Sequence, residues 1–194
     1  MTILKHNDQS GRSMVEMLGV LAIIGVLSVG GISGYSKAMA KFKLIKAQDQ
    51  ITMLLMNIRA AYATSPTYEG LTPAIAAEYN LAPGDMIVST SSGAELYGAF
   101  GGKIDVKAIG SGSAYFYITM NDLGKEACRS LGSSDWGTDG LIKMTINVSG
   151  DVSPTCTTGQ TASGKWCVSE LPAKLIDVNS SCSGTQNFIT WVYY

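Results

Sequence analysis

The residues that could do chemistry in this 194-residue chain include one histidine, His6, and four cysteines in the C-terminal third. A Ser/His/Asp triad, a Cys/His pair or a multi-histidine metal site would have to be built around His6 alone. The cysteines show no C-x-x-C spacing of the kind that holds zinc. We therefore expect no catalytic residues, no metal and no cofactor.

The cysteines themselves indicate a disulfide framework. An even number of them, Cys128, Cys156, Cys167 and Cys182, is typical of an exported domain in an oxidising compartment. Four cysteines allow three pairings, and their spacing alone does not choose among them.

Acidic residues and overall charge offer no further chemistry. Asp105, Asp122, Asp135, Asp139 and Asp151 are scattered, and nothing in the sequence brings two of them together as a hydrolytic pair. Fourteen basic against fifteen acidic residues give a net charge of -1. Bulk electrostatic binding to nucleic acid or to an anionic membrane is therefore not expected. We predict that the chain is not an enzyme.

The composition points instead to an apolar segment near the N-terminus. The run MLGVLAIIGVLSVGGISGYS, from Met17 to Ser36, carries no charge and as a helix would rise about 30 Å, the thickness of a bilayer core. A cleavable secretory signal and a soluble core helix are the alternatives. Membrane anchoring is favoured because the run continues into an amphipathic helix and is too long for so small a core.

Glu16 lies at the edge of this apolar run. An acid in a membrane is costly, less so near the interface, and so it requires a partner or a place among the headgroups. Position alone leaves both interpretations open.

The residues Gly11-Arg12-Ser13-Met14-Val15-Glu16, followed at once by the apolar run, resemble the processing signature of bacterial type IV prepilins. The resemblance implies that a prepilin peptidase cuts after Gly11 and leaves Arg12 as the mature N-terminus. It also implies that Glu16, the fifth mature residue, pairs with the free amine of a neighbouring subunit. One departure is Arg12, since the family usually has an apolar residue at this position.

The charges that flank the apolar run conflict with export. Four lysines follow the run, at positions 37, 41, 43 and 46, whereas Lys5 and Arg12 precede it. The positive-inside rule would therefore place the larger domain in the cytoplasm. We follow the cysteines and the prepilin signature, which both predict an exported domain.

Helical spacing continues beyond the apolar run. Leu44, Ile51, Leu55, Ile58 and Tyr62 recur on one face, with Lys46, Asp49, Gln50 and Arg59 elsewhere on the helix. Pro66 predicts an end near residues 63 or 64. The expected organisation is a leader at 1–11, a transmembrane and assembly helix at 12–36, its amphipathic continuation at 37–64 and a globular head at 65–194.

The head reads as mixed α and β structure. Residues 64–102 are turn-rich, a connecting region with one short helix at 72–79, and strands are predicted at 103–109, 114–120, 141–148 and 187–194. Asn121 or Asp122 would cap a helix that carries Cys128, and Ser169 would cap a second short helix. The predicted fold class is α+β, a long N-terminal helix packed on an antiparallel sheet with a disulfide-stapled C-terminal region.

Among the three pairings we favour Cys128 with Cys182 and Cys156 with Cys167, a long loop that encloses a shorter one. The outer pair resembles the disulfide-bounded region of type IVb pilins. In that subclass the region typically forms much of the outer surface of the filament.

The resemblance implies a structural subunit of a IVb-like pilus that serves adhesion, aggregation, motility or conjugation. Its partners would be copies of itself in a helical filament, the prepilin peptidase, the inner-membrane assembly machinery and, before assembly, the membrane. It would lie in the inner membrane first and on the cell surface afterwards, and binding of nucleic acid is left open. The alternatives are a minor pilin or secretion pseudopilin, and a membrane-anchored exported enzyme or binding protein.

Overall fold

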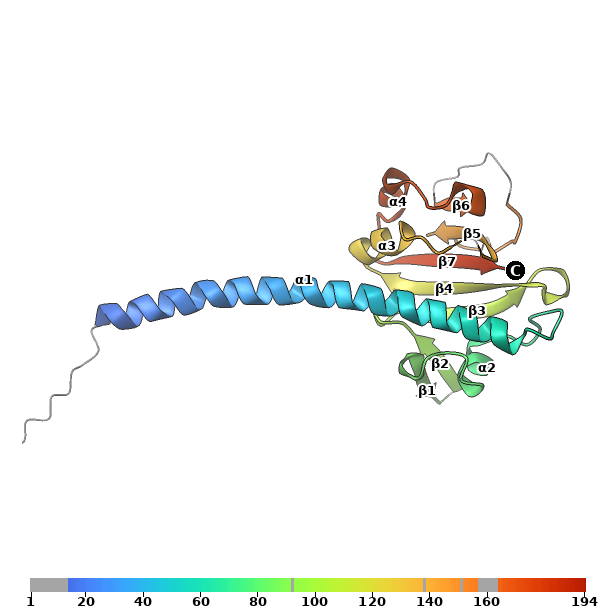
Figure 1. The fold of residues 1–194 in the computed structure, drawn as a ribbon, viewed down its shortest axis with the longest axis horizontal. Coiled ribbons are helices and arrows are strands. Elements are labelled where there is room, and N and C mark those ends of the chain that lie inside the picture. The colour runs from blue at the N-terminus through green and yellow to red at the C-terminus, as the bar shows by residue number, and fades with distance from the viewer. Residues whose placement is uncertain (1–13, 92, 138, 151, 157–163) are drawn as a thin grey trace, which may run out of the picture. The chain divides into compact units, whose positions relative to one another are not determined.

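The first element is one long helix, α1, which spans Met14–Ala61 (Figure 1). The computed structural model describes residues 14–91, 93–137, 139–150, 152–156 and 164–194. The helix ends two residues before the expected end, in a turn that precedes Pro66. The chain divides into two compact units, and α1 crosses the division, because the first unit ends at Phe42 and the second is Lys43–Tyr194.

The described part of the first unit is entirely helical and exposed, apart from the half-buried Met39. Large apolar side chains point outward all around the helix, among them Leu18 at 61%, Val26 at 76% and Val29 at 72% exposure. These residues have no core of their own within the unit. A helix can still form here because its backbone hydrogen bonds are satisfied within the segment.

The second unit begins with the amphipathic half of α1. Its buried residues are Ala47, Gln50, Ile51, Leu54 and Ile58, which recur at intervals of three and four. Ile51 and Ile58 are the expected core positions. Gln50 was placed on the polar side of the helix by its residue type, and this was wrong: it is 4% exposed.

A seven-stranded antiparallel sheet forms the centre of the second unit. The order of its strands is β1-β2-β3-β4-β7-β5-β6, so the C-terminal strand is inserted between β4 and β5 (Figure 1). The strands are β1 (Ile87–Thr90), β2 (Gly93–Tyr97), β3 (Lys103–Ile109), β4 (Tyr115–Leu123), β5 (Leu141–Ile146), β6 (Lys165–Cys167) and β7 (Asn187–Tyr193).

The two longest neighbours, β4 and β7, show how the core is built. Phe116 lies opposite Tyr193, Ile118 opposite Trp191, and Met120 opposite Ile189. Because side chains alternate across a strand, these six share one face, and all are almost fully buried. The buried apolar residues of α1, Ala47, Ile51, Leu54 and Ile58, belong to the same core. The long helix, the antiparallel sheet and the two disulfides confirm the predicted α+β class.

Three short α-helices accompany the sheet. They are α2 (Pro73–Glu78), α3 (Lys125–Gly132) and α4 (Leu175–Ser181), with 3-10 turns at Gly84–Met86, Ser111–Ser113 and Val168–Glu170. Thr72 caps α2 by accepting a hydrogen bond from the Ile75 amide at 3.2 Å, and Pro73 occupies the first turn.

The sequence analysis missed one part of the sheet. Residues 64–102 were expected to be a connecting region, yet they hold β1 and β2 at the edge of the sheet. The strands are short, and the exposed pattern of β1 lacks the apolar alternation that predicts a strand. Trp166 lies in β6, for which no strand was predicted.

Two predicted helix caps were wrong. Asn121 and Asp122 still belong to β4, and Gly124 is the N-cap of α3. Ser169 lies in a 3-10 turn, while α4 begins later, after Lys174. Pro172 explains this shift, because it keeps Leu171 extended.

The compact unit also begins earlier than the predicted head. The head was expected at 65–194, whereas the unit starts at Lys43. The difference arises because the second half of α1 contributes side chains to the core of the unit.

Candidate functional site

The apolar part of α1 is exposed on all sides of the helix. An 18-residue window of the helix has a mean hydropathy of 2.2 and is 0% buried, which is long and apolar enough to cross a membrane. Exposed apolar surface of this extent marks a contact with lipid or with other protein. These residues, 17–36, are called the apolar segment below.

Glu16 lies in the first turn of α1 and is exposed. It is the only acidic residue among the described residues of the first unit. The positive end of the helix dipole favours a carboxylate at this position. Within the described ranges the ion pairs are Lys46–Asp85 and Lys103–Glu95, so Glu16 has no cationic partner there. The predicted cleavage residues Gly11 and Arg12 lie outside the described residues.

The apolar segment carries glycines at positions 19, 25, 30, 31 and 34. A Cβ atom at any of them would meet no other atom within 4 Å, so the fold of this chain does not require glycine there. Glycines on a membrane helix permit close approach of a second helix. They are therefore suited to contacts between copies.

A second candidate surface lies on the disulfide-bounded region. Cys128 of α3 is bonded to Cys182, which directly follows α4, with a Cα–Cα distance of 5.8 Å. The second bond joins Cys156 to Cys167. These are the two pairs favoured from the sequence.

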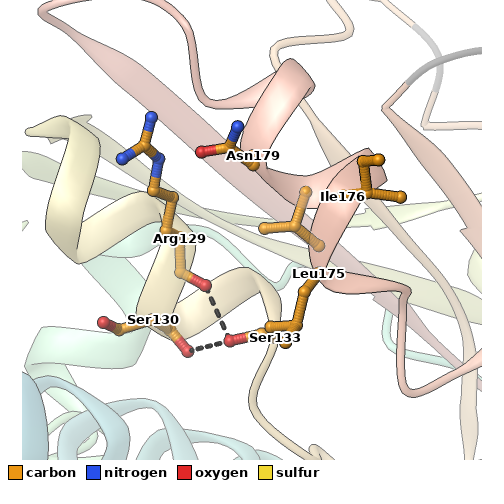
Figure 2. Close-up of a pocket in the computed structure, with 7 residues that line it drawn as sticks. Arg129, Ser130, Ser133, Leu175, Ile176 and Asn179 are labelled. Atoms are coloured by element: carbon orange, nitrogen blue, oxygen red, sulfur yellow. Dashed lines mark hydrogen bonds between the residues drawn. The ribbon is translucent and has the colours of Figure 1, made fainter.

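The buried Cys128–Cys182 bond holds α3 against α4. At the end of α3, a Cβ on Gly132 would come within 2.9 Å of Val178 in α4, so glycine allows this close packing. A groove of about 460 Å³ lies between the two helices, lined by Arg129, Ser130, Ser133, Leu175, Ile176, Val178 and Asn179 (Figure 2). Leu175 and Ile176 are each 74% exposed.

Two asparagines hold this region on the sheet, and the sequence analysis missed both. Asn187 donates to the carbonyl of Leu123 at 2.9 Å and to that of Gly184 at 3.0 Å. Asn147 donates to the carbonyl of Ser181 at 2.8 Å and to the side-chain oxygen of Asn187 at 2.8 Å. Asn147 has a positive φ of 56°, which marks it as an unusual position. This angle is known only from the structure, so the sequence offered no signal for either asparagine.

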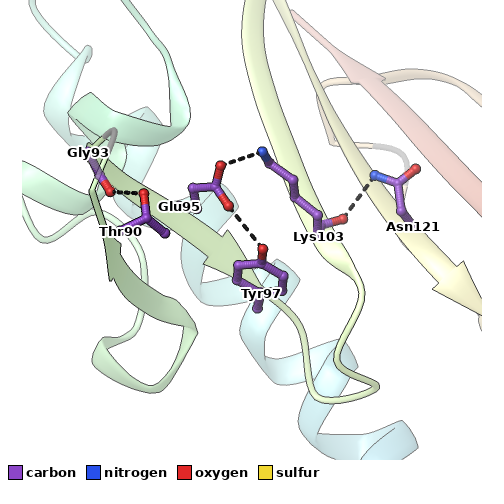
Figure 3. Close-up of polar contacts among 6 residues, drawn as sticks. All are labelled: Thr90, Gly93, Glu95, Tyr97, Lys103 and Asn121. Carbon is purple, nitrogen blue, oxygen red and sulfur yellow. Dashed lines mark hydrogen bonds and ion pairs between the residues drawn. The ribbon is translucent and has the colours of Figure 1, made fainter.

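The polar groups on β2 and β3 form a small surface network (Figure 3). Lys103 donates to Glu95 at 2.7 Å, and Tyr97 donates to the same carboxylate at 2.9 Å. These two hydrogen bonds lower the pKa of Glu95 and, reciprocally, raise the pKa of Lys103 and of Tyr97. The network is partly exposed: Lys103 is exposed, whereas Glu95 and Tyr97 are half-buried. It consists of one ion pair and a hydrogen bond, and it joins β2 to β3.

Two of the scattered acids accept hydrogen bonds from residues near them in the fold. Asp105 accepts a hydrogen bond from Tyr117 at 2.7 Å, Asp135 accepts from the amide of Gly137, and Asp151 lies outside the described residues. Across the part of the chain that the structure describes, no group of three or more His, Cys, Asp or Glu residues could hold a metal ion.

Comparison with known proteins gives consistent matches. The family model described as PilS N terminal matches residues 43–193, almost the whole second unit. The major structural subunit of bundle-forming pilus from Escherichia coli O127:H6 is 25% identical over 150 residues, 77% of this chain and 76% of that protein. The protein of the same description from Escherichia coli O111:H- is 26% identical over 137 residues, 70% of each chain.

Solved structures share the fold. TcpA, a type IV pilin from Vibrio cholerae El Tor biotype, superposes with a TM-score of 0.55 at 15% identity, over 78% of this chain and 99% of that one. The type IV b pilin from Salmonella typhi gives a TM-score of 0.50 at 18% identity, over 77% and 97% respectively.

Proposed function

Because the chain belongs to the PilS N-terminal family, we propose that it is a type IVb pilin, the structural subunit of a filament on the cell surface. The observation that carries the proposal is the exposure of the apolar segment of α1, which precedes a disulfide-bonded unit in the chain. An enzyme would have no use for twenty such residues beyond anchoring. In a filament subunit, all of these residues contact lipid before assembly and neighbouring subunits afterwards.

The apolar segment serves two states of the protein in this proposal. In the inner membrane, lipid surrounds the segment, and in the filament the same segments of neighbouring copies replace the lipid. The change is feasible because both surroundings are apolar. Little of the segment is exposed to water in the membrane or in the filament. The glycines allow the helices to approach one another closely.

Glu16 sets the position of each new subunit in the proposed filament. Its carboxylate has no partner among the described residues of its own chain, and the nearest cation in sequence is Arg12. A prepilin peptidase that cuts after Gly11 would create a free amine at Arg12. In apolar surroundings the carboxylate of one copy and the amine of the next attract strongly, but offset the cost of desolvation only in good geometry. The pair therefore favours one axial register.

The test is Glu16→Ala in the full chain, expressed with its assembly machinery, with Glu16→Asp as the matched variant that keeps the carboxylate. We expect Glu16→Ala to be cleaved and inserted in the membrane but to form no filaments, because the register pair is lost. Electron microscopy of sheared surface material measures filaments, and N-terminal sequencing measures cleavage. Normal filaments from Glu16→Ala would contradict the proposed role of this residue.

Cleavage is tested separately. Sequencing of the mature protein should begin at Arg12, and the precursor should retain His6. A surface product that keeps its first eleven residues, or a purified wild-type protein that stays monomeric in the presence of the machinery, would contradict the proposed function as a whole.

A further inference from the structure

Two exposed lysines follow directly after the apolar segment on α1. Lys37 is the first residue beyond the segment, and Lys41 lies one helical turn later on the same side of the helix. Tyr35, at the end of the segment itself, is 67% exposed. Tyr35, Lys37 and Lys41 are called the lysine collar below. All three belong to the first unit, which ends at Phe42.

The collar carries a positive charge that its own helix does not compensate. Glu16 is the only acid among the described residues of the first unit, and the helix from Glu16 to Lys37 is about 31 Å long. The next acid on α1 is Asp49, about two turns beyond Lys41. The residues between them add two further lysines, one of which pairs with an acid of the second unit. Neither collar lysine belongs to an ion pair among the described residues.

The depth of the collar in a membrane follows from the length of the apolar segment. As a helix, residues 17–36 span about 30 Å, the thickness of the hydrocarbon core of a bilayer. The headgroup layer adds about 5–7 Å on each side of that core. Lys37 therefore lies at the inner edge of this layer, and Lys41, about 6 Å further along the helix, lies near its outer edge. Glu16 lies at the opposite headgroup layer.

We propose that the lysine collar binds the phosphate groups of anionic phospholipids in the leaflet on the exported side of the membrane. This inference rests on the proposed function, because it concerns the state in which the apolar segment spans the membrane before assembly. The aliphatic stems of Lys37 and Lys41 lie along the end of the apolar region, and their amines reach the lipid phosphates. The ring of Tyr35 lies at the same interface, where aromatic side chains of membrane proteins are enriched.

A phospholipid is the occupant that depth and charge favour. Headgroups surround a membrane-spanning helix at the depth of the collar, whereas a protein partner would have to enter the headgroup layer to reach it. Each lysine near an anionic membrane surface strengthens binding about fivefold. The contact also gives these lysines a role on the exported side, where the positive-inside rule disfavours them.

The test measures which lipid the protein selects. The full chain is reconstituted in phosphatidylcholine vesicles that contain a trace of spin-labelled phosphatidylglycerol or of spin-labelled phosphatidylcholine. Electron paramagnetic resonance measures the fraction of labelled lipid held in contact with the protein. We expect the wild type to hold phosphatidylglycerol several-fold more strongly than phosphatidylcholine, and this ratio to fall as salt is added. Lys37→Gln combined with Lys41→Gln should bring the ratio close to one.

Two further variants serve as controls. Lys37→Arg combined with Lys41→Arg keeps both charges and should keep the wild-type ratio. Lys107→Gln removes an exposed lysine of β3, outside the collar, and should also keep it. Equal thermal unfolding of all variants shows that folding is intact. A wild-type ratio close to one would overturn the proposal, and so would a wild-type ratio retained by the double glutamine variant.

The vesicle experiment requires no filaments, so its failure is distinguishable from a failure of the proposed function. Filaments from a wild type that does not select phosphatidylglycerol would overturn the lipid contact and leave the proposed function standing. Selection of phosphatidylglycerol by a wild type that forms no filaments in the presence of its assembly machinery would overturn the proposed function and leave the lipid contact standing.

Discussion

At the scale of single residues, Tyr193 combines tight packing with an unmet polar group. Its ring stacks on Phe116 with centroids 5.4 Å apart and lies under the Arg59 guanidinium at 5.6 Å. Gly140 leaves the room that this guanidinium occupies, since a Cβ there would overlap it. The Tyr193 hydroxyl is buried and has no hydrogen-bond partner among the described residues. Burial raises its pKa, although the nearby Arg59 lowers it in part.

Because the Tyr193 hydroxyl has no hydrogen-bond partner among the described residues, its removal should not destabilise the fold. We expect Tyr193→Phe to leave the free energy of unfolding unchanged or to raise it by about 1 kcal/mol, because a buried donor without a partner costs its desolvation. Tyr117→Phe is the contrasting variant, expected to lose about 1 kcal/mol with its hydrogen bond to Asp105. Denaturant unfolding at neutral pH measures both, and a larger loss at Tyr193 than at Tyr117 would contradict the prediction.

The same two tyrosines predict a response to alkaline pH. Burial, and at Tyr117 the hydrogen bond to Asp105, raise the pKa of both hydroxyls above the ordinary value of about 10. Above that pH the unfolded chain releases these protons while the folded chain retains them, so the free energy of unfolding should fall as pH rises. Each Phe variant should show a shallower fall in unfolding curves collected above pH 10.

At the scale of elements, a polar cluster fastens α1 to the loops beside the sheet. Gln50 donates to Asp85 at 3.0 Å and accepts from the amide of Ala99 at 2.9 Å. Lys46 pairs with the same Asp85 at 2.7 Å. A buried glutamine is tolerated at this position because both ends of its amide are satisfied. The cluster fixes how α1 lies against the 3-10 turn at Gly84–Met86.

Asp85 makes this attachment sensitive to acid. The hydrogen bond from Lys46 is the largest cause and lowers the pKa of Asp85. Burial comes next and opposes it, and the hydrogen bond from Gln50 and the charge of Lys46 lower the pKa further. As pH falls, the Asp85 carboxylate takes up a proton in the unfolded chain before it does so in the folded chain. The stabilisation that the charged carboxylate gives at neutral pH is therefore lost as pH falls from the unfolded pKa through the lower folded pKa.

We therefore expect Asp85→Asn to lose less than about 1 kcal/mol at pH 7, because the pair is about 40% exposed and screened by solvent. The variant and the wild type should converge in unfolding experiments at acid pH. Asp49→Asn is the matched control, because Asp49 is an exposed acid on α1 that belongs to neither ion pair of the described residues. A difference that persists unchanged in acid would contradict the role of the charge.

At the scale of the whole molecule, two disulfides hold the C-terminal region of an exported subunit. Cys128–Cys182 spans 54 residues and is buried, whereas Cys156–Cys167 spans 11. The longer bond encloses β5, β6, the second disulfide and α4. It therefore supports the groove between α3 and α4 as well as the fold.

The lengths of the two disulfide-closed loops predict which bond contributes more to the free energy of unfolding. In the chain-entropy model, replacement of both Cys128 and Cys182 by serine should lower the free energy of unfolding by about 4 kcal/mol, against about 3 kcal/mol for the Cys156 and Cys167 pair. The contributions are measured by denaturant unfolding of the full chain in detergent without reductant. A greater loss from the shorter loop would contradict the ordering.

The amino-acid sequence by itself determined what depends on neighbours along the chain. The apolar segment, the length of α1, the helix after Thr72 and four of the strands follow from periodicity, turn residues and proline, which act within a few positions. The resemblance to prepilins rests on residues 11–16 and on the apolar run after them, again a local pattern.

Only the tertiary structure decided what depends on partners distant in the sequence. Gln50 is buried because Asp85 and the Ala99 amide lie where its amide needs them, and no pattern within α1 encodes those positions. The same holds for the placement of β7 between β4 and β5, and for the Asn187 contacts with Leu123 and Gly184. The groove between α3 and α4 arises where the Cys128–Cys182 bond holds together two helices that are remote in the chain. Burial is set by packing in three dimensions and not by residue type alone.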